Sequence, residues 1–118
     1  MNTFITIVGM HGDSVWLVWD EWTDSCVLPS SYGTGSVSNP TKLVRTILRH
    51  MGLQALTLDV YRRSHIQGRD HITVTSPCMW PLRDAAPHAT LVSLETYHEH
   101  YAQGIDIPNF LSKSVSPP

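Results

Sequence analysis

The sequence predicts a single domain of the α+β class, built from β-hairpins and two helices. Two segments alternate apolar and polar residues around short turn signals, a pattern typical of β-hairpins. One segment with helical periodicity is bounded by clear capping residues, and a second follows the last apolar run. The chain has 118 residues, of which 42% are apolar, so it is long enough to bury one hydrophobic core.

The first hairpin is expected from residues 3–9 and 14–22, which are rich in β-branched and aromatic side chains and flank a Gly12-Asp13 turn. Trp16 and Trp19 fall on opposite faces of the second strand, because side chains alternate along a strand. One of the two is therefore expected in the core, and the other at a surface or in a pocket.

The second hairpin is expected from residues 55–63 and 71–75, with a turn at residues 67–70 between them. Residues 76–89 contain three prolines and predict an ordered loop rather than a regular element. Residues 90–94 predict a last strand, which leads directly into the second helical segment.

The longer helix is expected at about residues 39–51. Ser38 or Asn39 would cap its N-terminus, and Gly52 would end it. The Gly- and Ser-rich residues before it predict a loop. The apolar stripe of this helix consists of Leu43, Val44, Ile47, Leu48 and Met51, and its polar side of Lys42, Arg45, Thr46, Arg49 and His50.

A second helix is expected at about residues 94–103, where Gly104 would end it. The domain is expected to span residues 1–111. Residues 112–118 are polar and proline-rich, so this tail is expected to be disordered.

Composition excludes several classes of protein. The net charge is −2 and only 15% of residues are charged, so the chain as a whole is not expected to bind nucleic acid electrostatically. Any anion site must be local, and six of the eight basic residues lie between positions 42 and 69. Cys26 and Cys78 are far apart and are expected to be free thiols. No signal segment or membrane span is expected, which favours a cytoplasmic protein.

The segment that contains the longer helix matches the spacing of a known motif. Residues 31–53 resemble the Nudix box, G-x5-E-x7-R-E-U-x-E-E-x-G-U, where U is a bulky aliphatic residue and Leu-Pro commonly precedes the motif. Arg45 falls on the Arg of the motif, Gly52 on the last Gly and Leu53 on the final U, without an insertion. Leu28-Pro29 stands at the expected distance.

The end of the chain extends this resemblance. Residues 89–101, ATLVSLETYHEHY, are similar to the closing strand and helix of the Nudix family, so the resemblance covers about residues 4–113. It implies an α/β/α sandwich, in which a curved mixed β-sheet lies with the Nudix-box-type helix at about 39–51 and the C-terminal helix at about 94–103.

The departures from the Nudix box concern its acids. In Nudix hydrolases these glutamates bind the divalent cations that carry the diphosphate and activate water. Their positions are held here by Val37, Thr46, Arg49 and His50, and Ser31 replaces the first Gly. Mg²⁺ prefers carboxylate oxygens, so the usual metal-dependent hydrolysis is not expected, and neither a metal nor another cofactor is expected at this place.

Two functions stay open. The first is metal-free acid/base chemistry on a small metabolite, such as an isomerisation, a cyclisation or a hydration, with His50, Arg49 and His65 as the candidate catalytic residues. The alternative is a non-catalytic binding or regulatory module for a nucleotide-like ligand or a protein partner. In either case Arg would bind an anion and aromatic rings would suit a planar ligand, so the candidate ligand-binding residues are Arg45, Trp16, Trp19, Tyr61 and Trp80.

A third function would keep a metal. Asp20, Glu21, Asp24 or Asp84 would then form a relocated site, and hydrolysis would depend on Mg²⁺ and stop with a chelator. The expected partner is a small molecule. By analogy with proteins of this fold, a homodimer is also expected.

Overall fold

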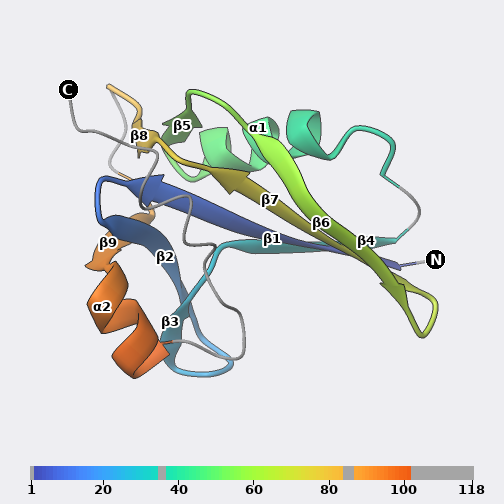
Figure 1. Cartoon of the computed structure of the whole chain (residues 1–118), viewed down its shortest axis with the longest axis horizontal. Coiled ribbons are helices and arrows are strands. Elements are labelled where there is room, and N and C mark those ends of the chain that lie inside the picture. The colour runs from blue at the N-terminus through green and yellow to red at the C-terminus, as the bar shows by residue number, and fades with distance from the viewer. Residues whose placement is uncertain (1, 35–36, 84–86, 102–118) are drawn as a thin grey trace.

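The computed structural model describes residues 2–34, 37–83 and 87–101, and its elements form an α/β/α sandwich (Figure 1). The helices are α1 (Pro40–His50) and α2 (Leu94–Thr96), and α2 continues as the π-helical segment η1 (Tyr97–Tyr101). The strands are β1 (Asn2–His11), β2 (Ser14–Asp20), β3 (Ser25–Val27), β4 (Ser30–Thr34), β5 (Leu53–Ala55), β6 (Asp59–Ile66), β7 (Arg69–Ser76), β8 (Met79–Pro81) and β9 (Ala89–Ser93). The α+β class is therefore confirmed.

The main sheet is mixed, as expected. Its strand order is β3-β2-β1-β7-β6, with β4 paired to β1 and β9 paired to β2. β1 runs parallel to β7 and antiparallel to β2 and β4. β5 and β8 form a separate two-stranded sheet. β1 lies at the centre and carries core residues on both faces of the sheet, whereas the core residues of β7 lie on the α1 side.

Both predicted hairpins are present. β1 and β2 meet around Gly12, whose φ of +61° lies in the left-handed region that glycine adopts without strain. β6 and β7 meet around Gln67 and Gly68, which have φ of +52° and +76°. Two consecutive left-handed residues match the twist of the flanking strands, which explains why so short a connection joins them.

Helix α1 begins and ends close to the predicted residues. The Asn39 side chain accepts a hydrogen bond from the Lys42 N–H at 3.2 Å, and Gly52 follows the last turn with φ of +77°. Val44 and Leu48 are buried, but Leu43 is 37% exposed. The prediction that Leu43 belongs to the buried stripe is wrong, because this residue lies at the edge of the stripe that turns towards solvent.

Four short strands lie where the sequence predicts loops or no separate strand. One is β3, which extends the first hairpin by pairing with β2. The other three have partners farther away in the sequence. β4 occupies the Gly- and Ser-rich segment before α1, and β8 occupies part of the proline-rich segment at residues 76–89. β5 directly follows Gly52 and pairs with β8. These strands form by pairing with partners distant in the sequence, so their own residues carry little local signal.

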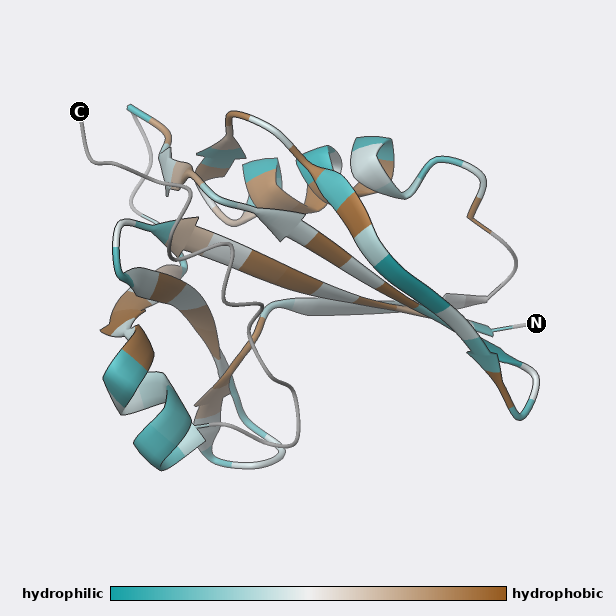
Figure 2. Cartoon of the chain, viewed as in Figure 1, coloured by the Kyte–Doolittle hydropathy of each residue, from teal (hydrophilic) through white to brown (hydrophobic). Residues whose placement is uncertain are grey.

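The core has two parts, one on each face of the sheet. Alternation along β1 sends Ile5 and Ile7 to the α1 face and Val8 and Met10 to the α2 face. Figure 2 shows the apolar residues concentrated in β1, β7 and the inner side of α1. The α1-side cluster comprises Ile5, Ile7, Trp16, Val44, Leu48, Leu53, Ala55, Ile72, Val74 and Met79. The α2-side cluster comprises Val8, Met10, Val15, Leu17, Leu28 and Tyr97.

The predicted C-terminal helix begins at Leu94, as expected, where the Ser93 side chain caps it by accepting from the Thr96 N–H at 3.1 Å. It is described as far as Tyr101. Gly104, the predicted tail at 112–118 and the end of the predicted domain lie outside the described residues. Within the described part of the chain, no helix is long and apolar enough to cross a membrane.

Gly9 is needed for the contact between β1 and β8. A Cβ at this position would overlap the Sδ of the buried Met79, and the neighbouring core leaves that side chain little room to move. We expect Gly9→Ala to destabilise the fold by about 1–3 kcal/mol, as other overpacked cores are. Urea unfolding followed by circular dichroism measures this change. Gly33→Ala is the matched control, because nothing lies within 4 Å of its Cβ position; equal losses in both variants would contradict the account.

Candidate functional site

The basic side of α1 borders a hollow of about 190 Å³ between this helix and β5. Arg45 and Arg49, one turn apart, both line it. Both side chains are exposed, and Arg45 is held in place because its Nη1 donates to the Ala55 carbonyl at 3.1 Å. The other lining residues are mainly apolar: Leu48, Leu53, Gln54, Ala55 and Leu82. The structure therefore brings together two of the residues singled out from the sequence.

The two candidate histidines do not line this hollow. His50 is exposed on the last turn of α1, directly after Arg49. His65 is exposed on β6, where it is the register partner of Asp70. The three candidate catalytic residues are thus divided between a helix and an edge strand.

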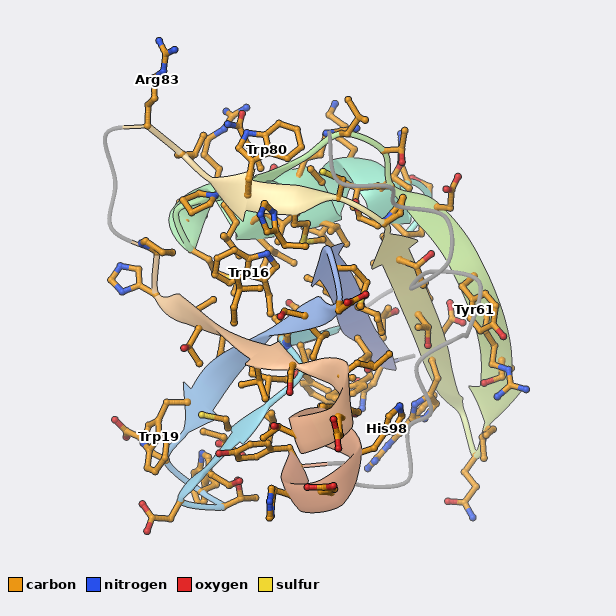
Figure 3. The ribbon with its side chains drawn as sticks, turned by 60° about the vertical axis from the view of Figure 1, so that its left-hand side comes forward. Trp16, Trp19, Tyr61, Trp80, Arg83 and His98 are labelled. Carbon is orange, nitrogen blue, oxygen red and sulfur yellow. The ribbon has the colours of Figure 1, made fainter. Side chains whose placement is uncertain are left out.

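The candidate aromatic residues lie at separate places (Figure 3). Trp16 is 4% exposed in the α1-side core, where its Nε1 donates to the Met79 carbonyl at 2.9 Å. Trp19 is 58% exposed on β2, and Tyr61 is 50% exposed on β6. Trp80 is half-buried on β8, paired with Gln54 of the α1 hollow. As predicted, Trp16 and Trp19 divide between the core and the surface, but the four rings do not surround one cavity.

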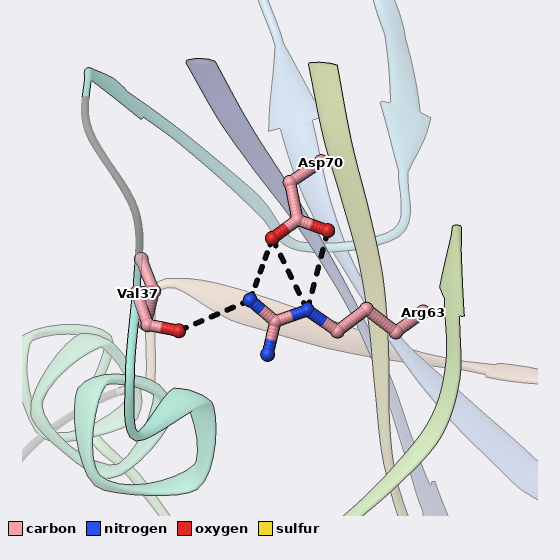
Figure 4. Close-up of polar contacts among 3 residues, drawn as sticks. All are labelled: Val37, Arg63 and Asp70. Carbon is pink, nitrogen blue, oxygen red and sulfur yellow. Dashed lines mark hydrogen bonds and ion pairs between the residues drawn. The ribbon is translucent and has the colours of Figure 1, made fainter. Parts of the chain in front are cut away.

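An ion pair joins β6 to β7 beside the segment that precedes α1 (Figure 4). The Arg63 Nη2 donates to the Asp70 Oδ2 at 2.7 Å, and its Nε lies 3.1 and 3.3 Å from the two carboxylate oxygens. The same Nη2 also donates to the Val37 carbonyl at 3.3 Å. The sequence resemblance aligns Val37 with the first acid of the Nudix box, and here the guanidinium of Arg63 contacts the backbone of this residue.

The Arg63 hydrogen bonds lower the pKa of the Asp70 carboxyl below its usual range, and the charges of Arg63, His65 and His71 act in the same direction against desolvation. Both carboxylate oxygens are therefore engaged by Arg63 at neutral pH. This pair was not predicted, since Arg63 and Asp70 are seven residues apart and meet only through the register of the hairpin. The sequence did contain one indication of the pair, because a basic residue precedes the hairpin turn and an acidic residue follows it.

Removing this carboxylate is expected to change how stability depends on pH. A group whose pKa is lowered by folding adds stability above its unfolded pKa, about 3.9 for Asp, and this stability is lost as the pH falls through the folded pKa. Wild type should therefore exceed Asp70→Asn in stability at neutral pH, and the difference should shrink below about pH 5. Urea midpoints measured across this range test it. Asp59→Asn, which removes an exposed carboxylate on the neighbouring strand β6, should not reduce the acid dependence. A constant difference for Asp70→Asn would contradict the assignment.

Three of the four acids proposed for a relocated metal site lie in or next to one turn, and one of them is hydrogen-bonded within it. The Asp20 carboxylate accepts from the Trp22 N–H at 3.2 Å and from the Thr23 hydroxyl at 2.9 Å. Glu21 and Asp24 are exposed in the same turn, and Asp84 lies outside the described residues. In the described part of the chain, no group of three or more His, Cys, Asp or Glu side chains is placed to hold a metal ion.

A second hollow of about 190 Å³ lies on the α2 side of the sheet. It was not predicted, although Tyr97 and Tyr101 recur at helical spacing in the predicted C-terminal helix, which was a usable signal. The hollow is lined by Phe4, Thr6, Asp20, Val27, Leu28, Ser30, Tyr97 and Tyr101. It shares no residue with the hollow beside α1.

The fold has clear relatives among solved structures, whereas no protein-family model and no curated protein sequence matches the chain. A MutT structure, from a set covering Aliivibrio salmonicida and Vibrio cholerae, aligns with a TM-score of 0.60 over 96% of this chain and 94% of its own, at 9% identity. An ADP compounds hydrolase aligns with a TM-score of 0.55 over 83% of this chain, at 15% identity. This chain spans only 60% of that hydrolase.

A third solved structure with a similar fold belongs to a protein with a different description. It is a Sinorhizobium meliloti protein, provisionally described as an oxidoreductase, that aligns with a TM-score of 0.58 at 19% identity. The match covers 81% of this chain and 32% of that protein. At such identities the similarity shows the fold alone. With the MutT and ADP compounds hydrolase matches, the sandwich described above is a Nudix-like fold.

Proposed function

We propose that this Nudix-like domain does not hydrolyse diphosphates with Mg²⁺, and that it binds the anionic group of a small molecule directly through Arg45 and Arg49. The observation that carries the proposal is that both guanidiniums line one hollow, with Arg49 at a position where the Nudix box has a metal-binding glutamate. A cation there would repel Mg²⁺ and attract the phosphate or carboxylate that the metal would otherwise hold.

The residues near the other motif positions support the same conclusion. Val37 offers no side-chain oxygen, and its carbonyl accepts from Arg63. Thr46 bonds back to the Lys42 carbonyl at 3.4 Å. The nearby Asp70 carboxylate is engaged by Arg63. Mg²⁺ requires several oxygen ligands in near-octahedral geometry, and this set of side chains does not fit it.

The hollow favours binding through charge and shape. Arg45 is preorganised by its bond to Ala55, so little side-chain entropy is lost when it also contacts an anion. Arg49 lies one turn later and would provide the second donor. Leu82, which is partly exposed at the hollow, would accept an apolar part of the ligand, whereas Leu48 and Leu53 belong to the α1-side core.

Metal-free acid/base turnover is the second candidate function. His50 favours it, because this exposed imidazole follows Arg49 in the last turn, and His is the side chain most often used for proton transfer in enzymes. His65 would need a ligand that extends to β6. Product formation that is lost in His50→Gln, while binding is retained, would establish this function.

The direct test is calorimetric titration of inorganic pyrophosphate and of ADP into the protein in the presence of a chelator. We expect saturable binding of at least one of these anions without any divalent cation. The absence of binding to both, in buffer of low ionic strength, would overturn the proposal, since exposed Arg contacts are strongest under those conditions.

A further inference from the structure

A row of three rings crosses the sheet on the face opposite α1. Tyr32 of β4 and His71 of β7 are both register partners of Phe4 on the central strand β1. The ring centroids of Phe4 and Tyr32 are 6.5 Å apart, and those of Phe4 and His71 are 6.0 Å apart. The three strands thus present neighbouring rings in one line.

The row faces solvent rather than the core. Ile5 and Ile72, the chain neighbours of Phe4 and His71, point into the α1-side core, so alternation turns the rings to the other face. Tyr32 is 56% exposed, and Phe4 and His71 are half-buried. None of the three rings belongs to either core cluster, and Phe4 at the centre of the row also lines the α2-side hollow. The row is therefore an aromatic surface that solvent can reach.

Two arginines flank the row on the same face. Arg62 is the register partner of Thr73, and Arg69 that of Ile66 and Asn2, one position on either side of the His71 row. Both arginines are exposed, and neither has a hydrogen-bond or ion-pair partner among the described residues. Asp70, the acid between Arg69 and His71, points to the other face and is paired with Arg63. Arg62 and Arg69 thus place positive charge beside the rings although the chain carries a net charge of −2, and Asp20 lines the α2-side hollow together with Phe4.

We propose that this face, defined by Tyr32, Phe4, His71, Arg62 and Arg69, binds single-stranded nucleic acid. Exposed rings on neighbouring strands offer stacking places for successive unpaired bases, and flanking guanidiniums contact the phosphates between them. Each ring can stack with about one base. A row of rings on three β-strands therefore suits an oligonucleotide of several nucleotides better than a single nucleotide. The prediction that the chain does not bind nucleic acid rests on its net charge. A net charge does not show that two arginines and three rings lie together on one face.

This site is independent of the hollow beside α1. The row lies on the other face of the sheet, and none of its five residues lines that hollow. Failure of anion binding at Arg45 and Arg49 would therefore leave the inference untouched, and the two are tested by different variants.

The test is fluorescence anisotropy with labelled oligouridine and oligothymidine of about eight nucleotides, a length within the range that sheet-based single-strand sites cover. We expect binding of at least one strand, in the range of about 10⁻⁴–10⁻⁶ M, that weakens as salt rises from about 50 to 200 mM. A duplex of the same length should bind more weakly, because its bases are not available for stacking. Equal affinity for duplex and single strand would overturn the proposal, as would no binding.

Variants separate stacking from charge. Tyr32→Ala should weaken binding by roughly 5- to 100-fold, the usual loss for one stacked base. Arg62→Gln should reduce the slope of log affinity against log salt by about 0.7, the value for one phosphate of a single strand. Trp22→Ala and Arg83→Gln remove an exposed aromatic ring and an exposed cation outside this face, and both should bind as wild type does. Equal effects of Tyr32→Ala and Trp22→Ala would contradict the site, and so would a mononucleotide that binds as tightly as the octamer.

Discussion

Arg49→Glu is expected to weaken binding of inorganic pyrophosphate by about 10- to 100-fold, because it removes a charge-assisted hydrogen bond, typically worth about 1.5–3 kcal/mol, and adds a repelling charge. Arg49 lines the α1 hollow beside Arg45, so the introduced carboxylate would face the bound anion. Calorimetric titration at one low ionic strength measures the change. The loss should shrink as salt is added, since Arg49 is exposed.

The control for this variant must separate binding from helix stability. A glutamate in the last turn of α1 also opposes the helix dipole, at a cost of about 0.3–1 kcal/mol. Circular dichroism at the titration temperature shows whether the variant stays folded. Arg83→Glu makes the same charge change on a side chain that points away from the rest of the molecule (Figure 3). If both variants lose binding equally, the effect is one of overall charge and the α1 hollow is not the site.

Trp16→Ala is expected to destabilise the fold by about 3–5 kcal/mol, the range for truncating a buried Trp. Its side chain is 4% exposed, packs in the α1-side core and donates to the Met79 carbonyl. Urea unfolding measures the loss. A variant that keeps wild-type stability and loses ligand binding would instead show that Trp16 contacts the ligand.

Trp22→Ala is the matched control, because that side chain is 97% exposed and its removal should change stability by no more than about 0.5 kcal/mol. Trp16→Phe gives a second comparison. It keeps most of the apolar volume and loses the N–H donor, so its cost should be smaller than that of the alanine variant.

The sequence predicted the elements whose signals are local. The two turns and the caps of α1 act over a few residues, and they placed the hairpins and the helix near their observed ends. β3, β4, β5 and β8 were not predicted as strands. β4, β5 and β8 exist through pairing with β1 or with each other across long stretches of chain, and β3 is only three residues long. A Ser- and Gly-rich segment such as β4 reads as a loop until its partner strand is known.

The same division applies to the candidate site. Arg45 and Arg49 line one hollow, as residues four apart share a helix face, and their role in binding stays a prediction. The aromatic residues were grouped only by type, and they lie on different sides of the molecule. The Arg63–Asp70 pair and the Tyr32–Phe4–His71 row depend on strand register, which no local pattern in the sequence specifies.

The central claim is that the domain binds anions without a metal and does not hydrolyse diphosphates. One measurement tests it most directly: calorimetric titration of ADP and of inorganic pyrophosphate with Mg²⁺, with Mn²⁺ and with a chelator, while the mixture is assayed for phosphate-containing products. We expect the anions to bind equally well when the chelator is present. We also expect no heat of binding when Mg²⁺ or Mn²⁺ is titrated alone, and no phosphate-containing products. Tight metal binding together with hydrolysis that the chelator abolishes would contradict it, and would mean that acids outside the Nudix-box positions hold the metal.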